Sequence, residues 1–122
     1  MESQGSHQEN HAIARIVGAR LTSVQFVLNY LILGFDEKGA LTTLIWPEVV
    51  EQSQVVVFRM SDYRNALCAL IGRIVQSTHV DRSETIHILL EQGVEIRIPL
   101  ASYDLAGERA ILTGPDRYLF VF

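Results

Sequence analysis

The sequence predicts a β-rich α+β fold, in which two antiparallel β-meanders and one short helix form a curved sheet or a partly open barrel. Two observations lead to this prediction. Apolar and polar residues alternate with a period of two in several segments after residue 20, which is typical of half-buried strands. Residues 61–71 instead repeat their apolar side chains with the period of a helix.

The first half of the chain contains four predicted strands. Its apolar segments are rich in Val, Ile, Leu, Phe and Tyr, and β-branched and aromatic residues favour strands. Asp36–Gly39 predicts a turn, and Pro47 ends the third strand because proline cannot donate to a ladder. The predicted strands are residues 21–28, 30–35, 40–46 and 55–58.

The predicted helix covers residues 61–71. Ser61 is the expected N-cap, since its hydroxyl can accept from free backbone N–H groups, and Gly72 is the expected stop. One apolar stripe follows the helical spacing i, i+3, i+4, i+7, i+8 and consists of Tyr63, Ala66, Leu67, Leu70 and Ile71.

The second half returns to the strand pattern. Val94, Ile96 and Ile98 alternate with Glu95 and Arg97, which predicts a half-buried strand. The last strand is apolar at every position from residue 119 to 122, so we expect it to be covered on both faces. The predicted strands are residues 74–80, 85–90, 94–98, 110–113 and 118–122.

Length and composition predict one globular domain over residues 13–122. The chain has 122 residues, of which 48% are hydrophobic and 20% charged, and this is enough for a core. Residues 1–12 are polar and lack apolar periodicity, so a disordered tail is expected there.

An internal duplication is one explanation for the similarity of the two halves. Residues 17–40 align with residues 71–94 at a constant offset of 54, which places Gly18 on Gly72. The alternative is chance, because any two hairpins share turn glycines and apolar strands. The residues leave both readings open, and the possible repeats are residues 17–47 and 71–99.

Charge and hydropathy argue against several classes of function. The net charge is −4, and no basic stripe is present to bind the phosphates of a nucleic acid. No apolar run approaches the length of a membrane span, and no signal-peptide pattern opens the chain, so a cytoplasmic location is expected. The lone Cys68 excludes an internal disulfide. No P-loop, dinucleotide-binding, zincin, CxxC or nucleophile-elbow pattern occurs, so we predict no cofactor and disfavour an enzyme.

Four residues are candidates for binding a partner. Trp46 lies at a strand end beside Glu48 and can anchor a partner protein or stack on a ligand. Arg59 and Arg64 lie near the start of the predicted helix, where they can bind an anion. The alternatives are that Trp46 closes one end of the core and that the arginines form structural ion pairs.

His79, Asp81 and His87 form the one candidate metal cluster in the sequence. A loop of residues 82–84 places His79 opposite His87 with Asp81 on the same face, whereas a two-residue loop separates the histidines. The pattern favours a solvated hairpin surface over a metal site.

The stretches VGARLTSVQFVLNYLILGFD, LIWPEVV and YRNALCALIGRIV resemble small bacterial proteins that join a β-meander, a short helix and a second meander. The resemblance implies a fold for most of residues 17–122 and implies no activity. Some similar small acidic α+β proteins are immunity partners of bacterial toxins, which makes such an inhibitor one alternative.

The sequence thus favours a non-enzymatic binding or interaction module that self-associates. Its high apolar content lacks a chemical signature, and several short strands present edges that can pair with another chain. The expected partner is a protein or a second copy of the chain. The alternatives are a small enzyme or ligand-binding pocket protein and the toxin-immunity-like inhibitor.

Overall fold

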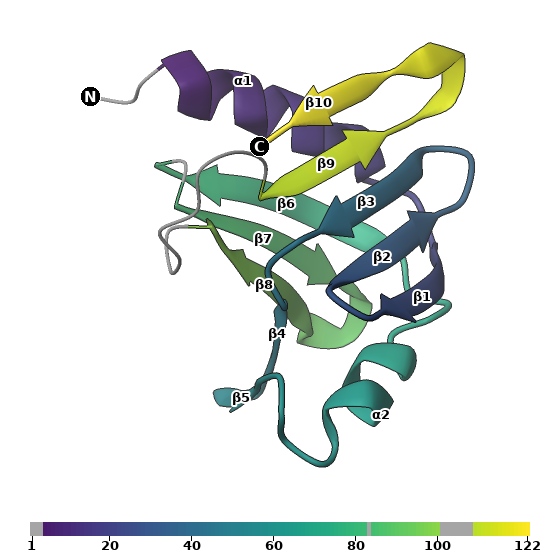
Figure 1. Ribbon diagram of the computed structural model, residues 1–122, viewed down its shortest axis with the longest axis vertical. Coiled ribbons are helices and arrows are strands. Elements are labelled where there is room, and N and C mark those ends of the chain that lie inside the picture. The colour runs from purple at the N-terminus through teal and green to yellow at the C-terminus, as the bar shows by residue number, and fades with distance from the viewer. Residues whose placement is uncertain (1–3, 83, 101–108) are drawn as a thin grey trace.

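The computed structural model describes residues 4–82, 84–100 and 109–122 (Figure 1). Within these residues, ten strands form two five-stranded antiparallel sheets, and two α-helices pack beside them. The sheets face each other without closing into a barrel, so the predicted β-rich α+β class is confirmed.

Each sheet combines a meander from one half of the chain with a hairpin from the other half. Sheet one has the order β1 (Leu21–Val27), β2 (Tyr30–Phe35), β3 (Gly39–Thr43), β9 (Ala110–Thr113) and β10 (Leu119–Val121). Sheet two has the order β5 (Gln54–Val56), β4 (Glu48–Glu51), β8 (Glu95–Pro99), β7 (Thr85–Leu90) and β6 (Val75–Asp81). The β4–β5 hairpin therefore follows β3 in sequence but pairs with β8, and β9–β10 follows β8 but pairs with β3.

The two sheets are joined at one corner, where the starts of β1 and β6 exchange backbone hydrogen bonds. The Gly18 N–H donates to the Val75 carbonyl at 2.8 Å, and the Gly72 N–H donates to the Leu21 carbonyl at 2.7 Å. Both glycines have positive φ, +88° and +102°. This backbone conformation is energetically unfavourable for residues that carry a side chain. An isolated bridge between Arg20 and Ile74 lies between these bonds.

Further details of the corner repeat in the two halves. The Asp36 carboxylate accepts from the backbone N–H of Arg20 at 3.0 Å, and the Glu91 carboxylate accepts from that of Ile74 at 2.9 Å. The β1–β2 and β6–β7 hairpins each have a register shift two residues into the first strand, at Leu21–Ser23 and Val75–Ser77. This equivalence supports an internal duplication, and the duplication itself stays a prediction.

One core cluster contains residues from the inward faces of both sheets. Strands β2 and β7, each next to an edge strand, have the same alternation of half-buried and buried positions, as the period-two pattern predicts. Their fully or nearly fully buried side chains are Leu31, Leu33, Phe35, Ile86, Ile88 and Leu90.

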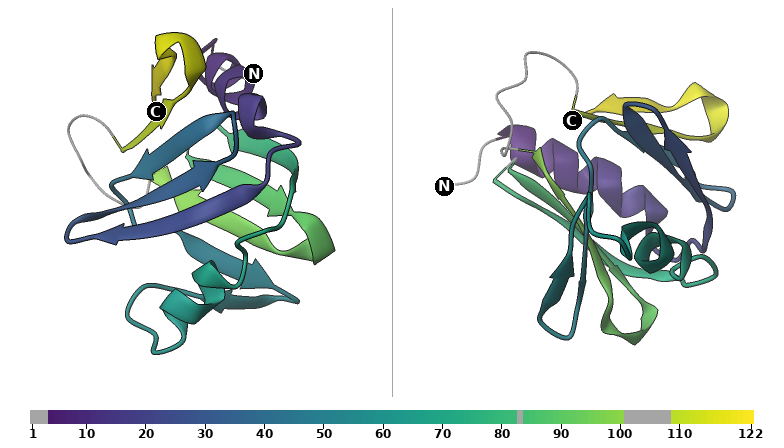
Figure 2. Two further views of the ribbon diagram at one scale, coloured as in Figure 1. Left: turned by 90° about the vertical axis from the view of Figure 1, so that its right-hand side faces the viewer. Right: turned by 60° about the horizontal axis from the view of Figure 1, so that its bottom comes forward.

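The prediction of a disordered tail is wrong for residues 4–12, because helix α1 spans Gln4–Ile13. The end of α1 and the following 3₁₀ turn η1 (Ala14–Ile16) bury Ala12, Ile13 and Ile16 in the core. Figure 2 (right) shows α1 between β6 and the β9–β10 hairpin. Apolar residues at the end of α1 and in η1 thus dock a helix that is otherwise polar.

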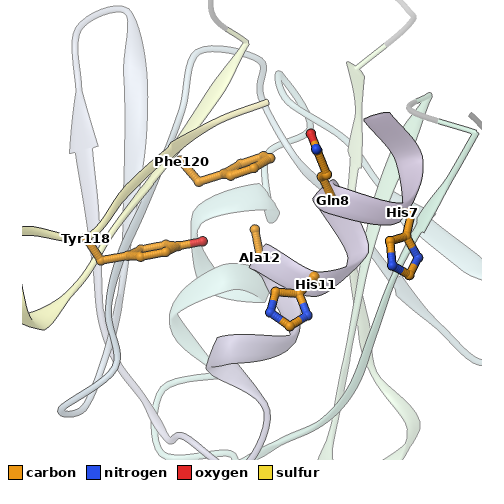
Figure 3. Close-up of a pocket in the computed structure, with 6 residues that line it drawn as sticks. All are labelled: His7, Gln8, His11, Ala12, Tyr118 and Phe120. Carbon is orange, nitrogen blue, oxygen red and sulfur yellow. The ribbon is translucent and has the colours of Figure 1, made fainter. Parts of the chain in front are cut away.

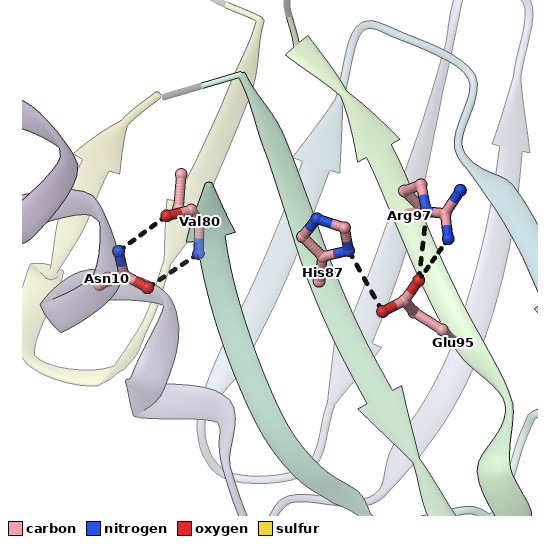
Figure 4. A network of polar contacts seen from close by, with 5 residues as sticks. All are labelled: Asn10, Val80, His87, Glu95 and Arg97. Carbon is pink, nitrogen blue, oxygen red and sulfur yellow. Dashed lines mark hydrogen bonds and ion pairs between the residues drawn. The ribbon is translucent and has the colours of Figure 1, made fainter. Parts of the chain in front are cut away.

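The side chain of Asn10 attaches α1 to the edge of sheet two. Its Nδ2 donates to the Val80 carbonyl at 2.9 Å, and its Oδ1 accepts from the Val80 N–H at 2.8 Å (Figure 4). These bonds join α1 to the backbone of β6, an edge strand of sheet two.

The first half differs from the prediction near residue 50. The sequence predicted one strand at 55–58, whereas β4 and β5 form a hairpin with Gln52 and Ser53 at positive φ in the turn. Strand β4 was missed because glutamates flank its two valines, and β3 ends at Thr43 before the predicted Trp46.

Helix α2 (Tyr63–Cys68) is shorter than predicted. Its N-cap is Asp62 and makes no side-chain capping bond, so the predicted Ser61 cap is wrong. The start of the helix is held instead by the burial of Tyr63, which is 3% exposed.

The expectation that the last strand is covered on both faces is also wrong. Strand β10 lies at one edge of sheet one, and its residues Leu119 and Val121 are 61% and 44% exposed. Phe120 and Phe122 point the other way and pack on the core.

Replacing Asn10 with alanine should lower the free energy of unfolding by about 1–3 kcal/mol, because the Val80 N–H and carbonyl lose their side-chain partner. Urea unfolding measures the change. The exposed Gln8 on the same helix provides the control, and Gln8→Ala should leave the transition near that of the wild type. Equal transitions for the two variants would show that α1 docks without these bonds.

Candidate functional site

Two of the predicted binding residues, Trp46 and Arg64, lie in one cleft. We call it the aromatic cleft. Its volume is about 270 Å³, and its lining residues are Phe26, Val27, Leu28, Trp46, Phe58, Tyr63 and Arg64. The β1–β2 turn, the segments flanking the β4–β5 hairpin and helix α2 each contribute to it.

Ring contacts fix the geometry of the aromatic cleft. Trp46 and Phe58 are stacked, with ring centroids 4.3 Å apart and an interplanar angle of 4°. The ring of Tyr63 meets Phe58 edge-on at 5.8 Å and Phe26 at 6.4 Å. Such pairs contribute beyond their buried area, so the rings hold one another in place.

Tyr63 is the structural centre of this cluster. Its hydroxyl donates to the Pro47 carbonyl at 2.5 Å and so fixes the segment that carries Trp46. Burial raises the pKa of Tyr63 well above its usual range, and the negative charge of nearby Glu48 adds to the rise. The phenol is therefore neutral at physiological pH, and its hydroxyl is engaged with the backbone.

Arg64 is the one charged residue among the described residues that line the aromatic cleft. It is exposed, and its guanidinium carbon lies 5.6 Å from the centroid of the Phe26 ring. The site can thus combine an apolar wall with one cation at its mouth.

The other two predicted binding residues do not line the aromatic cleft. Glu48 on β4 acts on Tyr63 through its charge, and the exposed Arg59 follows Phe58 in the chain. Trp46 and Arg64 thus lie together in the cleft, and the role of all four residues in binding stays a prediction.

Several apolar side chains in the aromatic cleft and in the chain segment beside it are exposed. Leu28 at the tip of the β1–β2 turn is 89% exposed, and Val57, Phe58 and Met60 are 37%, 40% and 44% exposed. Three rings of the cleft were not predicted as site residues, because Phe26, Phe58 and Tyr63 each fit an ordinary strand or helix pattern. The signal available was Leu28, an apolar residue at a turn position where polar residues are usual.

The candidate metal residues form a polar surface on the outer face of sheet two. His79 lies opposite His87, as the three-residue loop predicts, and their ring centroids are 6.1 Å apart. His87 Nδ1 is 3.2 Å from a Glu95 carboxylate oxygen, and the other oxygen accepts from Arg97 (Figure 4). Asp81 pairs with Thr85, and the described residues contain no group of three His, Cys, Asp or Glu side chains suited to a metal.

A larger groove of about 430 Å³ lies between α1 and β10 (Figure 3). His7 and His11 are one turn apart on the helix, and Tyr118 and Phe120 form the facing wall. The Arg15 guanidinium lies 3.6 Å from the centroid of the Tyr118 ring. Two imidazoles alone provide fewer ligands than a tetrahedral zinc site requires.

Replacing Tyr63 with phenylalanine should reduce the steepness with which the free energy of unfolding falls as the pH rises into the alkaline range. The raised pKa means that the neutral phenol stabilises the fold below the ordinary pKa of about 10, and this contribution is lost as the pH rises above that value. Urea unfolding at pH values between about 8 and about 11 measures the slope. Tyr30→Phe, the same substitution on the outer face of sheet one, provides the control. A Tyr63→Phe slope as steep as that of the wild type would contradict the assignment.

Comparison with known protein families, with curated proteins and with solved structures finds no match to this chain. The resemblance to small bacterial meander proteins therefore stays a prediction. Neither helix in the part of the chain that the structure describes has the length and apolarity required to cross a bilayer.

Proposed function

We propose that the protein is a non-enzymatic interaction module that binds an apolar side chain of a partner protein in the aromatic cleft. The stacked pair of Trp46 and Phe58, with exposed apolar residues around it, supports this proposal most directly. Tryptophan and arginine are enriched among the residues that dominate binding energy at protein interfaces.

The size of the aromatic cleft favours a single side chain over a metabolite. Small-molecule sites usually enclose roughly 300–1,000 Å³ and converge several polar groups on the ligand. This cleft measures about 270 Å³, and the hydroxyl of Tyr63 is already bonded to Pro47. One aromatic or leucine side chain of a partner is therefore the occupant that we propose.

The charge at the mouth adds a preference. Arg64 is exposed beside the cleft, so a carboxylate next to the apolar anchor can form a charge-assisted hydrogen bond with it. The proposed ligand is a peptide segment that carries an aromatic residue or leucine adjacent to Asp or Glu. The ring contacts and the Tyr63 bond pre-form the cleft, which reduces the entropy lost on binding.

Selection from a display library of random 12-residue peptides tests the proposal. We expect enrichment of peptides that place Phe, Trp, Tyr or Leu next to Asp or Glu. Trp46 is the only tryptophan in the chain, so titration of its fluorescence with the selected tryptophan-free peptides measures affinity at the cleft directly.

Three variants define the outcome. Phe58→Ala should weaken binding at least about tenfold, since the peptide loses the stacked wall. Arg64→Gln should remove the preference for an acidic peptide over its amide counterpart. Arg117→Gln, a matched change at an exposed arginine in the β9–β10 turn, should leave affinity unchanged. Failure to enrich such peptides, or equal binding by Phe58→Ala, would refute the proposal.

A further inference from the structure

The five strands of sheet one contain no Asp, Glu, Lys, Arg or His. Sheet two has the same arrangement, a three-stranded meander extended by a hairpin, but its strands carry many ionisable side chains. These are Glu48, Glu51, His79, Asp81, His87, Glu95 and Arg97. Sheet two therefore shows what a solvated face looks like in this architecture, and sheet one departs from it.

The register of sheet one places a neutral row across its outer face. Gln25 pairs with Ile32, Ile32 with Thr42, Thr42 with Ile111, and Ile111 with Val121. The corresponding row of sheet two consists of His79, His87, Arg97 and Glu48. The contrast between the two faces thus lies at equivalent positions.

Nothing in the described part of the chain covers the outer face of β1, β2 and β3, which faces the viewer in Figure 2 (left). Helix α1 contacts β6, and α2 contacts β1 and β4 from the side of the core. Exposed apolar side chains lie on this face or at its edge. They are Leu44, Leu119 and Val121, whose exposed fractions are 37%, 61% and 44%. A large uncharged face that exposes apolar side chains is typical of an interaction surface.

We infer that the outer face of sheet one packs against the same face of a second copy of the chain, with Thr42 close to the two-fold axis. A two-fold interface brings each residue near its own counterpart or neighbours, so charges on the face would repel across it. A charge-free face avoids this repulsion, whereas the row of His79, His87, Arg97 and Glu48 would not. Two copies of one sheet also have the same hand of twist, which lets them pack face to face.

The size of the face is consistent with a dimer interface. Five strands about 4.8 Å apart, with a mean of five residues rising about 3.3 Å each, cover roughly 400 Å² in flat projection. A standard interface buries roughly 800 Å² of accessible surface on each partner, so the whole outer face of sheet one has to take part.

Sedimentation velocity of the full chain, from micromolar to millimolar concentration, tests this inference. The wild type should be a dimer, and Thr42→Lys should raise the dimer dissociation constant about 100-fold or more by placing two cations at the axis. Thr85→Lys makes the same change on the outer face of sheet two and should leave the dissociation constant unchanged. Ile111→Lys provides a second variant on the proposed interface, and circular dichroism verifies that each variant is folded.

Three results would overturn the inference. The first is a wild type that stays monomeric at every concentration. The second is a dimer that Thr42→Lys and Ile111→Lys leave intact. The third is a dimer that Val121→Lys disrupts and Thr42→Lys spares, since that pattern indicates pairing along the β10 edge. Phe58→Ala lies in the aromatic cleft and should leave the dimer unchanged, so this test is independent of peptide binding.

Discussion

The hydrogen bonds between the starts of β1 and β6 determine how the two sheets meet. Gly18 and Gly72 place their N–H groups on the partner strand at positive φ, and Asp36 and Glu91 hold the adjacent backbone. This corner orients both meanders, so their buried faces meet in one core and their other faces point outward. The charge-free face and the aromatic cleft both depend on that orientation.

The local sequence pattern predicts the regular elements well. Strands β2, β7 and β9 have the predicted boundaries, because strict alternation and flanking turn residues define them without tertiary information. Strand β4 and helix α1 were missed, since each is short of apolar residues and gains its stability from contacts with distant strands. The exposure of β10 was missed because composition does not reveal which strand lies at an edge.

The sequence singled out two of the residues that line the aromatic cleft and missed its other rings. Trp46 stands out in the sequence as the single tryptophan, and Arg64 lies near the start of a recognisable helix. The rings of Phe26, Phe58 and Tyr63 reach Trp46 through the exchange of strands between sheets. Local patterns contain no information about that exchange, so the cleft becomes visible only in the folded chain.

The exchanged hairpins also affect how the chain folds. Because β4–β5 completes the sheet of the second half and β9–β10 completes that of the first, neither half contains a whole sheet by itself. The polypeptide must close long loops before either sheet is finished, and such non-local pairing slows folding. The strands of sheet two all lie between residues 48 and 99, whereas sheet one joins strands from residue 21 to residue 121, so during synthesis the first meander waits for its hairpin until sheet two has been made.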